Sequence, residues 1–110
     1  MKKIIKIPII DCRIELITAA TIELGLQLAD LKPNGKSYSA LVVPKSSHFA
    51  TLLFEKDNIT PGLIVHECKH ILNIFFEGIG QDLDLQNDEL ECYFLQYIFE
   101  QVNKTLNVKN

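Results

Sequence analysis

The apolar residues of this chain alternate in its first half and recur at helical spacing in its second half. Residues 3–18 are rich in isoleucine and alternate in two short stretches, which Pro8 and Asp11 separate. This pattern predicts one or two β-strands, with Pro8 at a sheet edge or a bulge. Two more strands are predicted over residues 37–43 and 47–54, joined by the three residues between them.

The segment between these two strand regions has a mixed pattern. Residues 22–28 alternate like a strand, yet residues 19–30 also fit a short helix that Thr18 or Thr21 can cap. We favour the helix, because a connection of this length between strands is more often helical. The run Lys32–Lys36 has the composition of a turn, since Pro, Asn and Gly each supply a turn conformation.

The second half of the chain predicts two long helices. Thr60 followed by Pro61 is a typical N-cap and first-turn pair, and Gly78 and Gly80 close the segment. The first long helix is therefore expected over residues 61–77.

The second long helix is expected over residues 88–106, after a polar connection at 81–87. Asn87 can cap it, and the acidic residues of its first turn suit the positive end of the helix dipole. Its apolar stripe consists of Leu90, Phe94, Tyr97 and Ile98, with Leu95, Phe99 and Val102 beside it. The predicted fold is α+β, with a small N-terminal sheet of about three to four strands packed on the first long helix and the second helix returning alongside.

The first long helix contains the pattern H-E-x-x-H, as His66-Glu67-Cys68-Lys69-His70. Residues four apart lie one turn above another on one helix face, so both imidazoles can reach one metal ion. Glu67 projects about a hundred degrees away, where a general base for a metal-activated water belongs. These three residues predict a zinc site with hydrolytic chemistry.

A catalytic zinc site needs a third protein ligand and an open position for water. No third histidine follows the motif, so the candidates are acidic: Asp82, Asp84, Asp88, Glu89 and Glu91. We favour Glu89, because an antiparallel return of the second helix brings its first turn beside the histidines. Asp88 and Glu91 remain open as alternatives, and all three carboxylates also suit a helix N-terminus.

Two segments of the sequence, TPGLIVHECKHILN and NDELECY, resemble a family of small zinc metallopeptidases associated with bacteriophages and prophages. The family pattern is H-E-x-x-H-x-x-N … N-D-E-x-x-x-Y. The matching residues are His66, Glu67, His70, Asn73, Asn87, Asp88, Glu89 and Tyr93. The resemblance covers residues 49–102, about half of the chain. It implies a zincin-like fold with zinc as the cofactor, and Glu89 as the third ligand in the manner of thermolysin-type enzymes.

Several residues near the motif have both a functional and a structural interpretation. Asn73 can orient a ligand or simply border the core. The hydroxyl of Tyr93, our second candidate catalytic residue, can stabilise an oxyanion or hold the third ligand, although buried tyrosine anchors are common. His48 can assist a substrate or the metal, but is expected in solvent. Cys68 and Cys92 are expected to be small buried residues, with a thiolate ligand as the alternative.

Composition and net charge narrow the class of protein to which this chain can belong. The chain has 110 residues, 47% of them hydrophobic, and no apolar run of membrane-spanning length, so we expect one soluble domain over residues 1–110. A net charge of −3 argues against a nucleic-acid partner, and three irregularly spaced cysteines favour a reducing compartment. Lys6, Pro8 and Asp11 interrupt any signal-peptide core. We expect a cytoplasmic protein, in the bacterial host if it is phage-encoded.

The leading functional hypothesis is a zinc-dependent metallopeptidase that hydrolyses a peptide or protein substrate, with Glu67 as general base. The predicted strand at 47–54 can pair with an extended substrate. The alternative is a zinc-binding structural or partner-binding phage protein with little or no turnover. A regulatory peptidase that cleaves a repressor differs from the first hypothesis only in its substrate. The sequence leaves the oligomeric state open.

Overall fold

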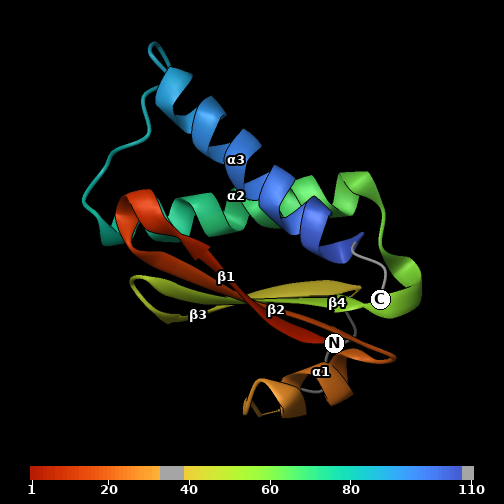
Figure 1. The fold of residues 1–110 in the computed structure, drawn as a ribbon. Helices are drawn as coiled ribbons and strands as arrows, with labels where there is room; N and C mark the ends of the chain where they lie inside the picture. Colours follow the sequence, from red (N-terminus) through yellow and green to blue (C-terminus); the bar gives the residue numbers. More distant parts are fainter. Residues whose placement is uncertain (33–38, 108–110) are drawn as a thin grey trace.

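The chain forms a sheet of four strands with helices on both faces, as predicted for an α+β domain (Figure 1). The computed structural model describes residues 1–32 and 39–107, so most of the predicted turn at 32–36 lies outside the described residues. The elements are β1 (Lys2–Ile7), β2 (Cys12–Ala19), α1 (Ile22–Leu28), β3 (Ala40–Ser46), β4 (Phe49–Glu55), α2 (Pro61–Gly78) and α3 (Glu89–Leu106). Short 3-10 turns follow β1 at Pro8–Ile10 and β4 at Lys56–Asn58.

The strand order in the sheet is β1-β2-β4-β3. Strands β1 and β2 form an antiparallel pair, β2 and β4 are parallel, and β4 pairs antiparallel with β3. Strand β4 therefore lies inside the sheet, and β3 is an edge strand. The predicted pairing of residues 47–54 with a substrate is wrong in this respect, because both edges of β4 are already occupied.

Strand β3 extends through Pro44 to Ser46, and the turn to β4 falls at Ser47–His48 rather than at the predicted 44–46. Proline lacks an N–H, so it is tolerated where that group faces away from the sheet. Pro44 meets this condition. The N–H of Glu55 in β4 donates to the carbonyl of Ser39 at 2.9 Å, and in an antiparallel pair only every second residue bonds to the partner strand. Ala40, Val42 and Pro44 are the residues in between, so their backbone groups point away from β4. No described strand pairs with this outer edge of β3, which we call its free edge, and it offers the N–H and C=O groups of Ala40 and Val42.

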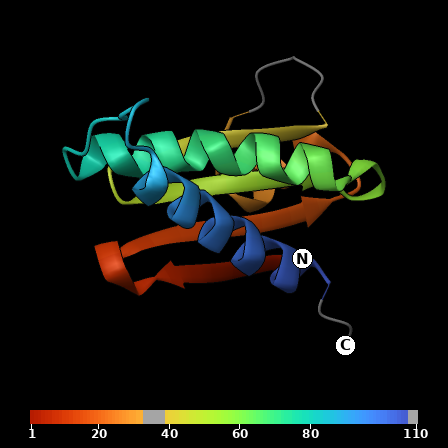
Figure 2. The ribbon, with the colours of Figure 1, turned by 90° about the horizontal axis from the view of Figure 1, so that it is seen from above.

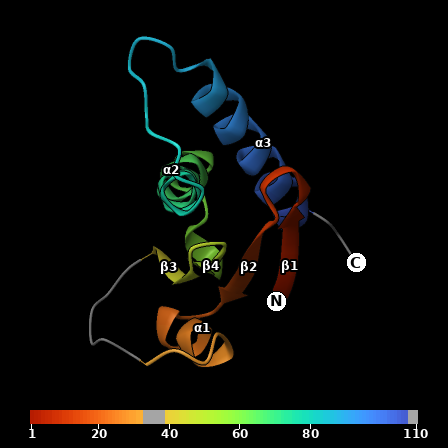
Figure 3. The same ribbon diagram turned by 90° about the vertical axis from the view of Figure 1, so that its left-hand side faces the viewer.

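The two faces of the sheet carry separate cores (Figure 3). On the larger face, α2 packs over the sheet and α3 packs on α2 and β1. On the other face, Ile22 and Leu26 of the short helix α1 pack on Ile17 and Leu53. In the part of the chain that the structure describes, no helix is long and apolar enough to cross a membrane.

Side-chain caps determine where the first two helices begin. The hydroxyl of Thr21 accepts the N–H of Leu24 at 3.2 Å, and that of Thr60 accepts the N–H of Leu63 at 3.1 Å. The expected N-cap at Asn87 is wrong. Asp88 takes the cap position of α3 without a side-chain cap bond. Asn87 belongs to the preceding turn, where its N–H donates to Asp84.

A buried carboxylate fixes α1 to the sheet. Glu15 of β2 is 4% exposed, and its carboxylate accepts from Thr51 at 2.9 Å and pairs with Lys45 at 2.9 Å and Lys2 at 3.3 Å. Both lysines also donate to carbonyls at the end of α1, those of Leu28 and Ala29. Burial alone raises the pKa of Glu15, but the bonds from Lys45, Thr51 and Lys2 outweigh it and hold the pKa below the ordinary 4.5.

We expect Glu15→Gln to lower the free energy of unfolding by about 2 kcal/mol at neutral pH, the usual scale for lost bonds to a charged group. Because the folded pKa lies below 4.5, the carboxylate stabilises the fold fully above that value and loses its effect as the pH falls through the folded pKa. Denaturant titrations of both proteins should therefore converge in acid. The exposed Glu100→Gln is the matched control, and a difference independent of pH would contradict this role.

Candidate metal centre

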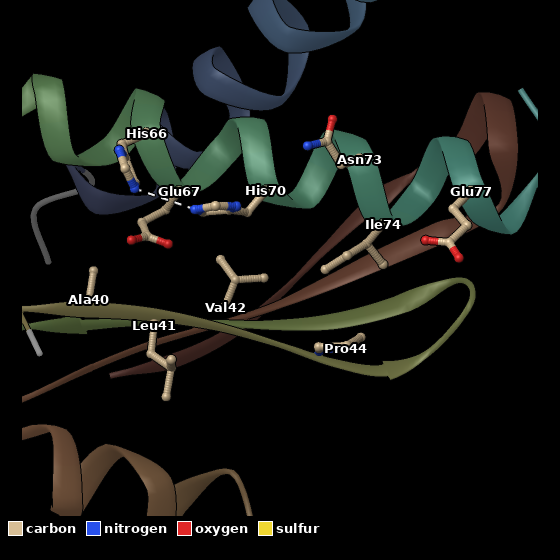
Figure 4. A pocket seen from close by; sticks show the side chains of 10 residues that line it. All are labelled: Ala40, Leu41, Val42, Pro44, His66, Glu67, His70, Asn73, Ile74 and Glu77. Carbon is tan, nitrogen blue, oxygen red and sulfur yellow. Dashed lines mark hydrogen bonds between the residues drawn. The ribbon is translucent and has the colours of Figure 1, made fainter. Parts of the chain in front are cut away.

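Helix α2 presents two different faces. Its apolar residues point into the core, and they are Ile64, Cys68, Ile71, Leu72, Phe75 and Phe76. Beside them, His66, His70, Asn73 and Glu77 follow each other at steps of three or four residues, so they share one stripe of the helix. These residues line the space between α2 and β3 at the edge of the sheet, although the amide of Asn73 points away from β3 (Figure 4). The predicted helix is confirmed, with one further residue at its end.

The two histidines of the motif point toward each other across one helical turn. Their Nε2 atoms are 3.3 Å apart, and their rings lie edge to face with centroids 5.0 Å apart. Both side chains are exposed. The i, i+4 spacing thus brings two imidazole nitrogens to one point beside the helix, as the sequence predicts (Figure 4).

Glu67 lies next to this pair but is nearly buried, with 7% of its surface exposed. Its carboxylate points toward β3, into the space beside His70 (Figure 4). Among the described residues it has no hydrogen-bond or ion-pair partner. A carboxylate held in this way keeps its acceptor capacity for a molecule in the adjoining space.

That space is a cavity of about 510 Å³ between α2 and β3, which we call the histidine groove. Its lining residues are Ala40, Leu41, Val42, Pro44, His66, Glu67, His70, Asn73, Ile74 and Glu77. The wall from α2 carries all the polar side chains together with apolar Ile74, while the wall from β3 is apolar throughout. The strand that forms this wall was predicted over residues 37–43, but its position beside the motif helix and its continuation through Pro44 were not. Pro44, a residue typical of edge strands, was the available signal.

The histidine pair fits a zinc ion in spacing and chemistry. Two nitrogens bound to zinc at about 2.0–2.1 Å in tetrahedral geometry lie about 3.3 Å apart. The Nε2 atoms of His66 and His70 have this separation. The same distance also suits a hydrogen bond between the two rings. The geometry of the pair is therefore compatible with a bound metal ion but is also explained without one.

The described residues do not bring a third ligand to the pair. Within 1–32 and 39–107, no three His, Cys, Asp or Glu side chains gather as a metal-binding group. Glu89 begins α3 and is exposed, and it does not line the histidine groove. Helix α3 does return along α2, but it crosses obliquely on the side away from β3 (Figure 2). The assignment of Glu89 as third ligand therefore remains a prediction.

The alternative acids are no better placed in this structure. Asp88 is exposed at the cap position of α3. The carboxylate of Glu91 accepts the backbone N–H of Asp84, which ties it to the connection between the helices. Of the three acids, Glu91 is the one already engaged in a local bond.

Tyr93 also lies apart from the histidine groove. It is 66% exposed and borders a separate apolar hollow formed with Ile9, Leu90, Phe94 and Tyr97. Its expected contact with a reacting group is not seen, and its catalytic role remains a prediction.

The remaining candidates have local partners or other surroundings. His48 lies in the β3–β4 turn with Nδ1 2.8 Å from the hydroxyl of Ser47. The amide oxygen of Asn73 accepts from Lys69 at 2.7 Å, so it bonds a lysine rather than a histidine. Cys68 is buried in the core, where desolvation raises its pKa to about 12, and Cys92 is exposed with its pKa also raised. The expectation of a buried residue is thus confirmed for Cys68 and wrong for Cys92, and neither cysteine lines the histidine groove.

Comparison of this chain with protein-family models, with curated proteins and with solved structures gives no match.

Proposed function

We propose that this protein is a zinc-dependent hydrolase of peptide bonds with a zincin-like arrangement. One observation carries the proposal: two converging imidazoles and a nearly buried carboxylate without a partner among the described residues line the same groove. The spacing H-E-x-x-H alone would also occur on an inert helix. A shared, open groove beside all three side chains is what hydrolytic chemistry additionally requires.

In this proposal His66 and His70 hold zinc through Nε2, and Glu67 moves protons. When bound, zinc acts as a Lewis acid that makes water a nucleophile at neutral pH. Glu67 accepts the proton of the attacking water and delivers it to the nitrogen of the leaving amine. Its low exposure favours this role, because bulk water does not compete strongly for the carboxylate.

Glu89 is our proposed third ligand, and it requires the first turn of α3 to approach the histidines. Every residue from 79 to 90 is exposed, so no buried side chain anchors this stretch. The buried residues of α3, Ile98 and Val102, lie in its second half. Movement of the first turn therefore leaves Ile98 and Val102 in place, but it requires the edge-to-face contact of Phe94 with Phe76 of α2 to rearrange.

The free edge of β3 is suited to bind the substrate as an added strand. Ala40 and Val42 direct backbone donors and acceptors away from β4, along the open side of the histidine groove. An extended peptide paired there passes below His66, His70 and Glu67 (Figure 4). This proposal moves the expected pairing from residues 47–54 to β3.

A second candidate function is metal binding without turnover, in a structural or partner-binding role. The observation that favours it is the absence of a third ligand beside the histidines among the described residues. An exposed two-histidine site binds a metal without creating a dry catalytic environment. Glu67 distinguishes the two functions, because a purely structural site needs no base in the groove.

Elemental analysis and a peptide-cleavage assay together test the proposal. Protein purified without added metal should contain about one zinc per chain. A broad library of fluorogenic peptides should show cleavage that a zinc chelator stops and added zinc restores. Zinc without cleavage would favour the binding function, and a chain that takes up no zinc would refute both.

A further inference from the structure

The histidine groove continues well beyond the residues that carry the proposed chemistry. It follows α2 from His66 to Glu77, and its middle section is apolar, with Ile74 on the helix and Val42 on β3 (Figure 4). Glu77 ends this path, and its carboxylate points into the groove on the side of Pro44. Nothing in the proposed hydrolysis uses this residue.

The charge of Glu77 is not balanced by a described neighbour. Both ion pairs among the described residues are made by Glu15, on the other face of the sheet. The two lysines closest in sequence to the groove are engaged elsewhere: Lys69 donates to Asn73, and Lys45 bonds Glu15 and the carbonyl of Ala29. The other carboxylate of the groove, Glu67, adds negative charge. A cation is therefore the complementary group for this end.

The distance along the groove fixes where such a cation must sit on a peptide. Glu77 lies seven residues after His70, a rise of about 10 Å along the helix. An extended chain advances about 3.3 Å per residue. A side chain about three or four residues from the scissile bond therefore reaches Glu77, and the residues between them pass the apolar section.

We propose, on the basis of the peptide-hydrolysing function proposed above, that Glu77 selects extended peptides carrying a lysine or arginine about three or four residues from the scissile bond. Between the scissile bond and that basic residue, the selected peptides carry apolar residues. Glu77 acts on substrate binding and is a specificity-determining residue. The substrate class is thus a basic, partly apolar segment rather than an acidic one.

Binding measurements separate this inference from catalysis. We would label extended peptides that carry arginine at one position, and compare each with the same peptide carrying citrulline, which has nearly the same shape without the charge. Fluorescence anisotropy on the Glu67→Gln protein, with and without zinc, gives both dissociation constants without turnover. Moving the arginine along the peptide, on both sides of a central apolar residue, locates the preferred position.

We expect the best arginine peptide to bind about twofold to fivefold tighter than its citrulline partner, the scale of an exposed ion pair. When Glu77→Gln is added, the arginine and citrulline peptides should bind with about equal dissociation constants. With Glu77→Lys, the citrulline peptide should bind more tightly. Adding Glu100→Gln, an exposed acid on α3, should leave the ratio of the two dissociation constants unchanged. High salt should reduce the ratio.

A ratio that Glu77→Gln does not change, or no binding by any peptide, would overturn the inference. Cleavage without a charge preference at any position would also overturn it, while leaving the proposed hydrolase intact. Failure to bind zinc or to cleave, with the Glu77-dependent preference still present, would instead overturn the hydrolase and leave a peptide-binding groove.

Discussion

Replacing Glu67 by glutamine should lower the rate of peptide hydrolysis at least about a hundredfold while zinc content stays at the parental level. Glutamine has nearly the same size and shape, but it cannot accept the proton of the attacking water. Glu67 is 7% exposed and makes no hydrogen bond or ion pair with another described residue, so among those residues the substitution removes no polar contact. The measurement is kcat/KM on a peptide that the parent cleaves in a chelator-sensitive way.

The control for this variant is Glu100→Gln, which removes the same charge from an exposed position on α3. It should cleave at the parental rate. Thermal unfolding should show that both variants fold as the parent does. Equal cleavage by Glu67→Gln and the parent would mean that Glu67 is not the base or that a contaminant is responsible.

Loss of either motif histidine should abolish stoichiometric zinc binding. His66→Ala and His70→Ala each remove one of the two nitrogens that converge at 3.3 Å, and a single imidazole on an exposed helix is a weak ligand. Glu89→Ala should weaken zinc binding strongly if α3 closes on the site as proposed. Competition with a chromogenic chelator gives the affinities of all three variants.

Asp82→Ala is the control in this series, because Asp82 is an exposed acid in the same connection. It should bind zinc like the parent. If Glu89→Ala also binds like the parent, Glu89 is not a ligand, and Asp88→Ala and Glu91→Ala become the variants to measure. Zinc should also raise the midpoint of thermal unfolding of the parent, since it binds the folded state.

Local signals predicted helix α2 correctly because they act within a few residues. Thr60 caps the helix through its own hydroxyl, Pro61 suits the first turn, and the spacing of His66 and His70 fixes their common face. These features depend little on the rest of the chain. The helix and the histidine pair were therefore accessible from the sequence alone.

Features that depend on distant packing were not predicted. The placement of β4 between β2 and β3 is a choice of pairing partners, and the alternation within each strand does not encode it. The position of Glu89 depends on the angle at which α3 crosses α2. That angle follows from contacts of Ile98 and Val102, far along the helix from Glu89 itself.

All residues that line the histidine groove lie between positions 40 and 77 of the chain. This stretch consists of the hairpin β3–β4, the 3-10 turn at Lys56–Asn58 and helix α2, and the groove forms where α2 lies over β3. Apart from the proposed third ligand Glu89, the chemistry proposed here therefore belongs to one continuous segment of the chain.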